Sequence, residues 1–472
     1  MEFRNHTPFP ALAFEGIDQH DQRFYVIALR QTLDLTQDGP IYADDQQPLR
    51  EEDAYFGEVG HSGVREESDL CHFKPKCDII VNGTARAPGG RPASRFHVRL
   101  VVRKPDGRPI AIPEPPQGLN PLMSASPEAI KQWERECAAM LSRGAPGQTL
   151  IDKTLVVTGE RFLRKSSFAT SWMARACRWM TLGGVRPVPW TLSAPSPCLE
   201  VPLRAELAFG GECLVSAGSP AAARVPADRR LANKSDETSQ VAHTAFGANP
   251  IGVGWSEDWY LKAAGITHLP APRIESPDAP FDLAVFARAV SGKALPERQE
   301  VAGFGIRVKG HPDRAPLIGT VDEEFIASGR CLPQDFDFAI WNAAPPDQQI
   351  EYPSGGEIVE LINLFPADAP GASIDAHGNT VVRFALPSHL AFARVRLEDG
   401  ACFRLPMHVD TVLIDTDRRQ LSMIWRRIVG KVQDAPVRVL EAGVLSVEQR
   451  RERDRLFAEW DTRTRKMEMR DA

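Results

Sequence analysis

Long apolar runs are missing from this sequence of 472 residues. No stretch approaches the ~18 apolar residues that a membrane-spanning helix requires. The N-terminal segment MEFRNHTPFPALAFEGIDQHDQRF also lacks the basic region followed by an apolar stretch that marks a secretory signal. We therefore expect a cytoplasmic protein that does not insert into membranes.

An excess of positive charge is also absent. Lys and Arg number 56 against 62 Asp and Glu, which gives a net charge of −6. Such a chain has no overall field that would attract phosphate backbones, so we expect no nucleic acid partner. The short basic runs around Arg161, Arg164 and Lys165 and at Arg426-Arg427 are interpreted as solvated surface, as most charge runs are.

Signatures of metal, nucleotide and catalytic sites are missing as well. Eight cysteines are scattered without a CxxC pair, and the local group of Cys71, His72 and Cys77 has no second cluster to complete it. The sequence contains no P-loop, no HExxH, no GxSxG and no GxGxxG that opens a helix after a strand. We therefore predict no metal ligands, no cofactor, no catalytic residues, and small buried thiols.

Carboxylates come nearest to a catalytic pattern at Asp410, Asp415 and Asp417. Paired carboxylates can act as general acid and general base. The alternation along VDTVLIDTD favours turns instead, because Asp accepts hydrogen bonds from its own backbone in turns. We interpret these three residues as turn residues.

Proline is abundant, with 39 in the chain, or roughly 8% against a usual ~5%. Each proline removes a backbone donor, which disfavours long helices. Hydrophobic residues make up 43% of the chain, enough for a substantial core, and FHVRLVVRK (96–104) alternates as a half-buried strand does. We predict a mainly β fold of packed antiparallel sheets, an irregular sandwich, with a few peripheral α-helices.

The β-rich body is expected to span 1–430 as one lobe or as two closely packed lobes, about 1–205 and 206–430. Apolar runs on both sides of the polar segment 18–21 predict a β-hairpin, and 381–427 predicts a β-meander with Asp-Gly and Asp-Thr-Asp turns. These segments account for much of the expected sheet structure.

Helices and a mobile segment are expected at three places. A capping serine followed by proline predicts a helical insertion at 126–143. The small and polar residues of 215–240 predict a flexible insertion without apolar anchors. In the tail, 431–472, one narrow apolar face predicts a helix at 446–468, which packs on its own body or on a partner.

Nine signatures follow one another along the chain: CDIIVNGTARAPGG, VVTGERF, LAFGGE, NPIGVGW, LPAPRIE, AGFGIR, DFDFAIWNAAPPDQQ, GGE and DTVLID. In this order they resemble the bacterial domain-of-unknown-function family 2169, over roughly residues 10–430. The positions that match the family's pattern are Asn82, Gly83, Pro88, Gly89, Gly90, Gly159, Arg161, Phe209, Gly210, Gly211, Asn249, Pro250, Gly252, Pro270, Asn342, Pro345, Gln348, Gln349, Gly356, Glu357, Asp410 and Thr411.

The resemblance implies a role in Gram-negative type VI secretion. Members of this family look like cytosolic adaptors or chaperones that bind a toxic effector and load it onto a spike protein of the VgrG or PAAR type. No catalytic role attaches to the matching positions, which we interpret as structural or partner-binding. Glycine, proline and asparagine dominate them, and these residues serve backbone geometry more than chemistry.

Two departures and two alternatives accompany this interpretation. Phe162 and Trp341 replace other aromatic residues of the family pattern, so we expect core packing to be preserved.

One alternative is an enzyme of unknown chemistry that uses the loop carboxylates Glu160, Glu357 and Asp410. The other is a structural component that remains in the spike.

Overall fold

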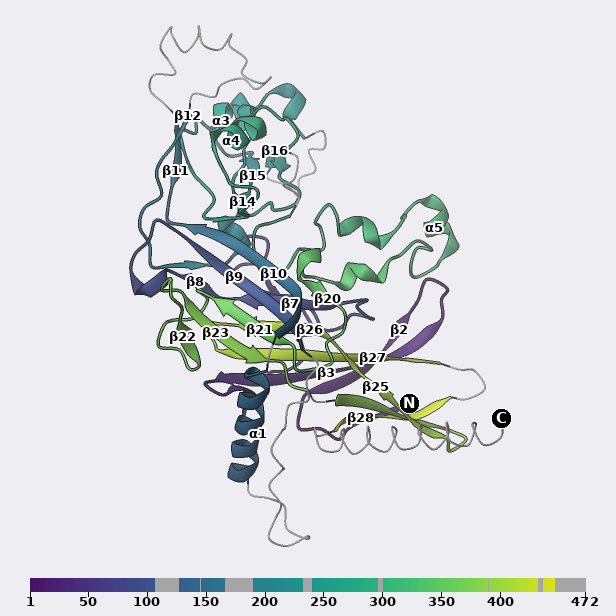
Figure 1. Cartoon of the computed structure of the whole chain (residues 1–472). Helices are drawn as coiled ribbons and strands as arrows, with labels where there is room; N and C mark the ends of the chain where they lie inside the picture. The colour runs from purple at the N-terminus through teal and green to yellow at the C-terminus, as the bar shows by residue number, and fades with distance from the viewer. Residues whose placement is uncertain are drawn as a thin grey trace, which may run out of the picture.

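The computed structural model describes residues 1–106, 127–144, 146–165, 190–231, 240–295, 300–388, 390–431 and 436–445. Within these ranges the chain is mostly β-strand, arranged in several sheets with short helices at their periphery (Figure 1). The predicted fold class, mainly β with packed antiparallel sheets and peripheral helices, is confirmed.

The largest sheet has seven strands, in the order β2-β3-β27-β26-β7-β20, with β4 also paired to β3. Their bounds are β2 (Ala11–Ile17), β3 (Arg23–Thr36), β4 (Gly39–Tyr42), β7 (Cys77–Asn82), β20 (Gln349–Ile350), β26 (His408–Asp415) and β27 (Gln420–Gly430). β26 runs parallel to β7, and the other pairs are antiparallel. The β2–β3 hairpin confirms the turn predicted at 18–21, where the Asp18 N–H donates to the Gln22 carbonyl.

The second sheet has six strands in the order β19-β10-β9-β21-β23-β22. Their bounds are β9 (Arg95–Pro105), β10 (Pro146–Thr158), β19 (Ile274–Glu275), β21 (Ile358–Ile362), β22 (Ala372–Ile374) and β23 (Thr380–Ala385). In β9, Phe96, Val98 and Leu100 are buried while the residues between them are not, as the alternation of the sequence predicts.

A third sheet has four strands in the order β1-β28-β24-β25. Their bounds are β1 (Glu2–Asn5), β24 (Leu390–Leu397), β25 (Cys402–Pro406) and β28 (Val437–Leu445). The β-meander predicted for 381–427 is therefore wrong, because β23, the β24–β25 hairpin and the β26–β27 hairpin belong to three different sheets. Local alternation reveals the hairpins and not their distant partners.

Short strands and helices complete the described fold. The small sheets contain β5 (Ala54–Tyr55), β6 (Val64–Glu66), β8 (Thr84–Arg86), β11 (Phe162–Lys165), β12 (Trp190–Leu192), β13 (Glu200–Pro202), β14 (Phe209–Gly210), β15 (Glu212–Ser216), β16 (Gln240–Ala245), β17 (Val253–Gly254) and β18 (His268–Pro270). The α-helices are α1 (Pro127–Ser142), α3 (Asp258–Ala263), α4 (Leu283–Val290) and α5 (Glu323–Ser328). The 3-10 helices are η1 (Pro88–Gly90), η3 (Ala205–Leu207), η4 (Ala222–Arg224), η5 (Ala227–Arg229), η6 (Ala315–Ile318), η7 (Phe338–Trp341) and η8 (Pro346–Gln348).

One main hydrophobic core joins the three large sheets. It includes Ile79 of β7, Leu100 of β9, Val359 of β21, Val395 of β24 and Val412 of β26, all 0% exposed. The seven-stranded and six-stranded sheets each contain strands from both sides of residue 205. Sheet membership therefore does not separate 1–205 from 206–430, and the division into two lobes stays a prediction.

The expected helices and insertions have different outcomes. α1 matches the helix predicted at 126–143 and extends away from the sheets (Figure 1). Among the described helices, none is long and apolar enough to cross a membrane. The helix predicted at 446–468 lies outside the described residues.

The segment predicted as a flexible insertion, 215–240, is anchored in its described part. Val215, Ala221 and Val225 are buried in a small core with Trp259 of α3. The premise that this stretch has no apolar anchor is therefore wrong for 215–231, because three apolar residues spaced along a polar sequence are enough to dock it. Residues 232–239 lie outside the described residues, and the flexibility itself stays a prediction.

Candidate functional site

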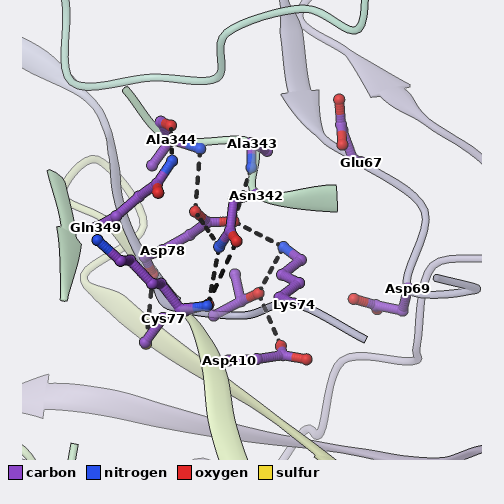
Figure 2. Close-up of polar contacts among 12 residues, drawn as sticks. Glu67, Asp69, Lys74, Cys77, Asp78, Asn342, Ala343, Ala344, Gln349 and Asp410 are labelled. Atoms are coloured by element: carbon purple, nitrogen blue, oxygen red, sulfur yellow. Dashed lines mark hydrogen bonds and ion pairs between the residues drawn. The ribbon is translucent and has the colours of Figure 1, made fainter. Parts of the chain in front are cut away.

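Asp78 is the centre of a buried polar cluster on β7 (Figure 2). Its side chain is fully buried and accepts hydrogen bonds from Lys74 Nζ at 2.9 Å and Asn342 Nδ2 at 3.0 Å. The backbone N–H groups of Ala343 and Ala344 also donate to it, at 2.8 and 3.3 Å. A single carboxylate therefore holds the segment around 342–344 against β7.

Strand pairing brings the other members of the cluster to Asp78. Thr411 of β26 lies opposite Asp78 on one side, and Gln349 of β20 lies opposite it on the other. The pairing of β26 with β27 shifts register between Val409 and Thr411, which leaves Asp410 as an extra residue. Such a bulge redirects a side chain, and Asp410 is buried rather than placed in a turn.

Asp410 forms a buried ion pair with Arg426 of β27. Arg426 Nε donates to Asp410 Oδ2 at 2.6 Å, and Arg426 Nη1 donates to the carbonyls of Asp69 and Cys71 at 2.7 and 3.0 Å. Burial works against the charge of Arg426, yet Asp410 holds its pKa above the ordinary value. The interpretation of Asp410 as a turn residue and of Arg426 as solvated is wrong, because both side chains find partners across strands.

Lys74 links the two buried carboxylates. Its ammonium group donates to Asp78 and also to Thr411 Oγ1 at 2.8 Å, while the Thr411 hydroxyl donates to Asp410 Oδ1 at 3.0 Å. Burial again opposes the charge, and Asp78 and Asp410 raise the pKa of Lys74 above its ordinary value. We call the set Lys74, Asp78, Asn342, Asp410, Thr411 and Arg426 the β7 polar cluster.

Two further buried ion pairs lie beside the β7 polar cluster. Arg30 of β3 contacts Glu66 at 2.8 Å, and Arg314 contacts Glu67 at 2.6 Å. Burial opposes the ionisation of Glu66, but Arg30 and Arg50 outweigh it and keep the pKa of Glu66 below its usual range. Since Arg314 is fully buried, its pair with Glu67 fixes the segment after residue 300 to the body.

A second group of motif residues surrounds Asn249. Asn249 Nδ2 donates to the carbonyls of Ala205 and Phe209 at 2.8 and 3.1 Å, and the Gly211 N–H donates to the Asn249 carbonyl at 2.9 Å. Gly210 has φ +157°, and a Cβ atom there would lie 2.1 Å from the Asn249 carbonyl oxygen. This close approach explains why glycine occupies the position.

Arg161 joins the second group to the six-stranded sheet. Its guanidinium donates to the Pro272 carbonyl at 2.8 Å and to the buried carboxylate of Glu275 in β19. Beside this group lies a pocket of about 280 Å³, lined in part by Pro250 and Gly252. Arg161 is therefore an internal anchor, and its interpretation as solvated surface is wrong.

The remaining amide side chains of the motif also bond to the backbone. Asn82 Nδ2 donates to the Arg65 carbonyl at 2.9 Å. Gln348 Nε2 donates to the carbonyls of Ile79 and Phe304 at 2.8 and 3.0 Å. These bonds connect strand β7 to the segment at Arg65, 17 residues away, and to Gln348, 269 residues away.

Glu357 has a similar structural role at the start of β21. Its carboxylate accepts hydrogen bonds from the backbone N–H groups of Ser354 and Gly355, at 2.8 and 2.9 Å. Glu160, the other carboxylate considered for chemistry, is exposed. Neither arrangement resembles a positioned acid and base.

The motif positions are mostly interior. Of the residues that resemble the family pattern, Gly89 and Gly90 are exposed on the η1 turn. The buried or half-buried ones are Asn82, Gly83, Pro88, Gly159, Arg161, Phe209, Gly210, Gly211, Asn249, Pro250, Gly252, Asn342, Pro345, Gln348, Gln349, Gly356, Glu357, Asp410 and Thr411. Pro270 of β18 is exposed on the rim of the pocket near Asn249. The motif thus maintains the fold more than it presents a surface.

Lys74, Asp78 and Arg426 are members of the site that the sequence motifs do not single out. A signal was present, because Asp78 stands in the apolar strand CDIIVN and Arg426 follows the apolar run LSMIW. A charge in an apolar strand is rarely buried unless it is paired. The sequence could have indicated buried ion pairs, but not which partners form them.

The described residues contain no group of three or more His, Cys, Asp or Glu placed to hold a metal ion. Among the described cysteines, Cys71, Cys77, Cys137 and Cys213 are buried, Cys198 is half-buried, and Cys331 and Cys402 are exposed. The prediction of buried thiols is therefore confirmed at four positions and wrong at the two exposed ones, and Cys177 lies outside the described residues. Burial raises the pKa of the Cys71 thiol to about 11. The absence of metal and cofactor stays a prediction.

Comparison with known proteins gives one family. A family model described as an uncharacterized protein conserved in bacteria, DUF2169, matches residues 20–112 and 125–426. No match to a curated protein or to a solved structure was found. The matched residues include both motif groups and the β7 polar cluster. The chain therefore belongs to the bacterial family DUF2169.

Proposed function

We propose that this protein is a cytosolic, non-enzymatic adaptor of a type VI secretion system. In this role it binds one toxic effector and loads it onto a spike protein of the VgrG or PAAR type. The proposal originates in the resemblance of the ordered motifs, and the family match supports membership without assigning a role.

One observation supports a binding scaffold best: the motif side chains are occupied by internal hydrogen bonds. Asn82, Asn249, Asn342 and Gln348 each donate to backbone carbonyls, and Asp78 receives four donors. Such bonds fix the relative positions of strands and loops. A rigid body of this kind suits a protein that presents a shaped surface to a partner, since less ordering entropy is lost on binding.

The enzyme alternative receives little support from the three carboxylates it invoked. Asp410 is paired with Arg426, Glu357 accepts backbone N–H groups, and Glu160 is exposed. A general base needs access to a substrate proton and a pKa suited to its task. A buried carboxylate with a guanidinium partner at 2.6 Å favours a structural role.

Co-expression with neighbouring gene products tests the proposal. If the gene lies between a spike gene and a toxin gene, those two products are the candidate partners, and an inactive toxin from another locus is the control. We expect the adjacent toxin, but not the control toxin, to co-elute with this protein in size-exclusion chromatography. The mass of the adjacent toxin should be unchanged. Failure to form a complex, or a covalent change in the toxin, would contradict a non-enzymatic adaptor.

A further inference from the structure

A pocket of about 350 Å³ opens beside the Asp410–Arg426 pair. The rings of Phe73, Tyr352 and His408 and the side chain of Ile428 line it. Tyr352 and His408 are stacked, with ring centroids 4.8 Å apart and planes inclined by 17°. The Tyr352 hydroxyl donates to the Lys74 carbonyl, so this aromatic wall is fixed to the segment before β7.

Positive charge exceeds negative charge in the lining. The cations Lys74, Arg426 and Arg427 line the pocket together with a single carboxylate, Asp410. Lys74 forms an ion pair with Asp78, and Arg426 forms an ion pair with Asp410. Arg427 therefore carries the charge that these carboxylates do not balance.

The Arg427 guanidinium has few hydrogen-bond or ion-pair partners within the described residues. Its Nη1 lies 3.4 Å from His408 Nε2, and its buried Nε has no hydrogen-bond partner there. In the described part of the chain no carboxylate lies within 4.0 Å of its guanidinium. Burial, and then Arg427, hold the pKa of His408 below its ordinary value, so the imidazole can accept this contact in its neutral form. Arg427 is half-buried, and its charge has no carboxylate partner in the described part of the chain. An anionic ligand in the pocket would supply that partner.

We propose that this pocket binds the C-terminal carboxylate of a protein partner whose last residue is aromatic or large and apolar. Arg427 lines the pocket, and a guanidinium is a charged, planar donor group that suits a carboxylate. The rings of Phe73, Tyr352 and His408 suit the adjoining side chain. A Glu or Asp side chain would supply the charge without apolar surface to fill the volume. The inference rests on the proposed function for the identity of the partner and names the chemistry by which it docks.

N-acetyl-phenylalanine is the probe that tests the pocket directly, and N-acetyl-phenylalanine amide is its uncharged control of the same shape. By isothermal titration calorimetry we expect the acid to bind and the amide to bind roughly tenfold to a hundredfold more weakly, as loss of a charge-assisted hydrogen bond predicts. Equal binding of acid and amide, or binding of neither, overturns the proposal.

Variants assign the binding to Arg427. Arg427→Gln should weaken binding of the acid by roughly tenfold or more without changing that of the amide. Arg438→Gln, at an exposed position of β28, removes the same charge elsewhere and should have no effect. Should Arg427→Gln fail to fold, Arg427→Lys retains the charge, loses the planar fork and should give a smaller loss. Undiminished binding in the folded Arg427 variant overturns the proposal.

A third probe distinguishes the sources of a carboxylate. N-acetyl-glutamic acid α-amide carries only a side-chain carboxylate and should bind more weakly than N-acetyl-phenylalanine. Tighter binding of the glutamic acid derivative overturns the proposal that the pocket binds a C-terminal carboxylate. These titrations need no effector, so their failure leaves the adaptor proposal standing. Conversely, failure of the toxin to co-elute leaves the measured ligand binding intact.

Discussion

At the scale of single residues, Asp78 belongs to one short strand but binds segments that lie far away in the sequence. Its partners at 342–344 are 264 to 266 residues away along the chain. The sequence CDIIVN shows a charged side chain, Asp78, within an apolar strand. Hydrogen bonds between residues so far apart in the sequence leave no local pattern from which the partners could be predicted. The strand was therefore predictable, whereas the buried site was not.

Replacing Asp78 by alanine should be strongly destabilising. The Lys74 ammonium and the N–H groups of Ala343 and Ala344 would lose their acceptor in a buried setting. Breaking a buried ion pair from one side typically costs about 3–5 kcal/mol. Urea unfolding measures this loss, and Asp152→Ala, in an exposed pair with Arg99, is the control, with an expected cost of about 0–1 kcal/mol. Equal costs would show that the β7 polar cluster does not hold the fold.

Gly159 makes a second prediction at this scale. A Cβ atom there would lie 1.7 Å from the carbonyl oxygen of Ser196, so the backbone must shift to admit even a methyl group. Gly159→Ala should destabilise the protein by more than about 1 kcal/mol. Gly218→Ala, with no atom within 4 Å of its Cβ, is the matched control and should change stability little. A thermal unfolding midpoint unchanged by Gly159→Ala would contradict the packing described.

His72 and His408 should make the stability of the fold depend on pH. Burial, and then Arg426 and Arg427 respectively, lower the pKa of His72 and of His408 in the folded state. An unfolded histidine titrates near ~6.5, so the unfolded chain binds protons first as the pH falls. Their contribution to stability is present above about pH 6.5 and is lost below it. The double variant His72→Gln, His408→Gln should lose less stability than the parent between pH 7.5 and 5.5; an identical loss in urea unfolding would contradict this.

At the scale of elements, the hairpins and the inserted helix follow from local patterns. The β2–β3 hairpin and α1 could be predicted because turn residues, a capping serine and periodicity lie within one segment. The arrangement of β23, β24 and β26 in three sheets could not, since β23 pairs with β21 and β24 pairs with β28. Those pairings depend on which apolar faces meet in the core.

Hydrogen exchange should follow the position of each strand in its sheet. β27 lies between β3 and β26 and is mostly buried, whereas β25 is an edge strand with exposed side chains. Amides of β27 should therefore exchange among the slowest in the chain and those of β25 much faster, because edge strands open at lower free energy. Mass spectrometry of peptides from both strands measures this, and protection of β25 as strong as that of β27 would contradict the sheet order.

At the scale of the whole molecule, the interior position of the motif has a consequence for function. Most positions that resemble the family pattern are interior, so under the proposed function the surface that recognises a partner would be built largely from other residues. Composition and motif order could indicate a β-rich scaffold from the sequence. The surface that a partner contacts could not be predicted, because it depends on how distant loops meet on the folded body.

Deletion of the gene in a strain with an active type VI secretion system tests the adaptor role most directly. Export of each toxin would be measured by quantitative mass spectrometry of the culture medium, and sheath contraction would be followed by microscopy in the same cells. We expect one cognate toxin to be lost from the medium while contraction continues, and the wild-type gene to restore export. Normal export of every toxin would contradict a loading role, and loss of contraction would make the protein a structural part of the apparatus.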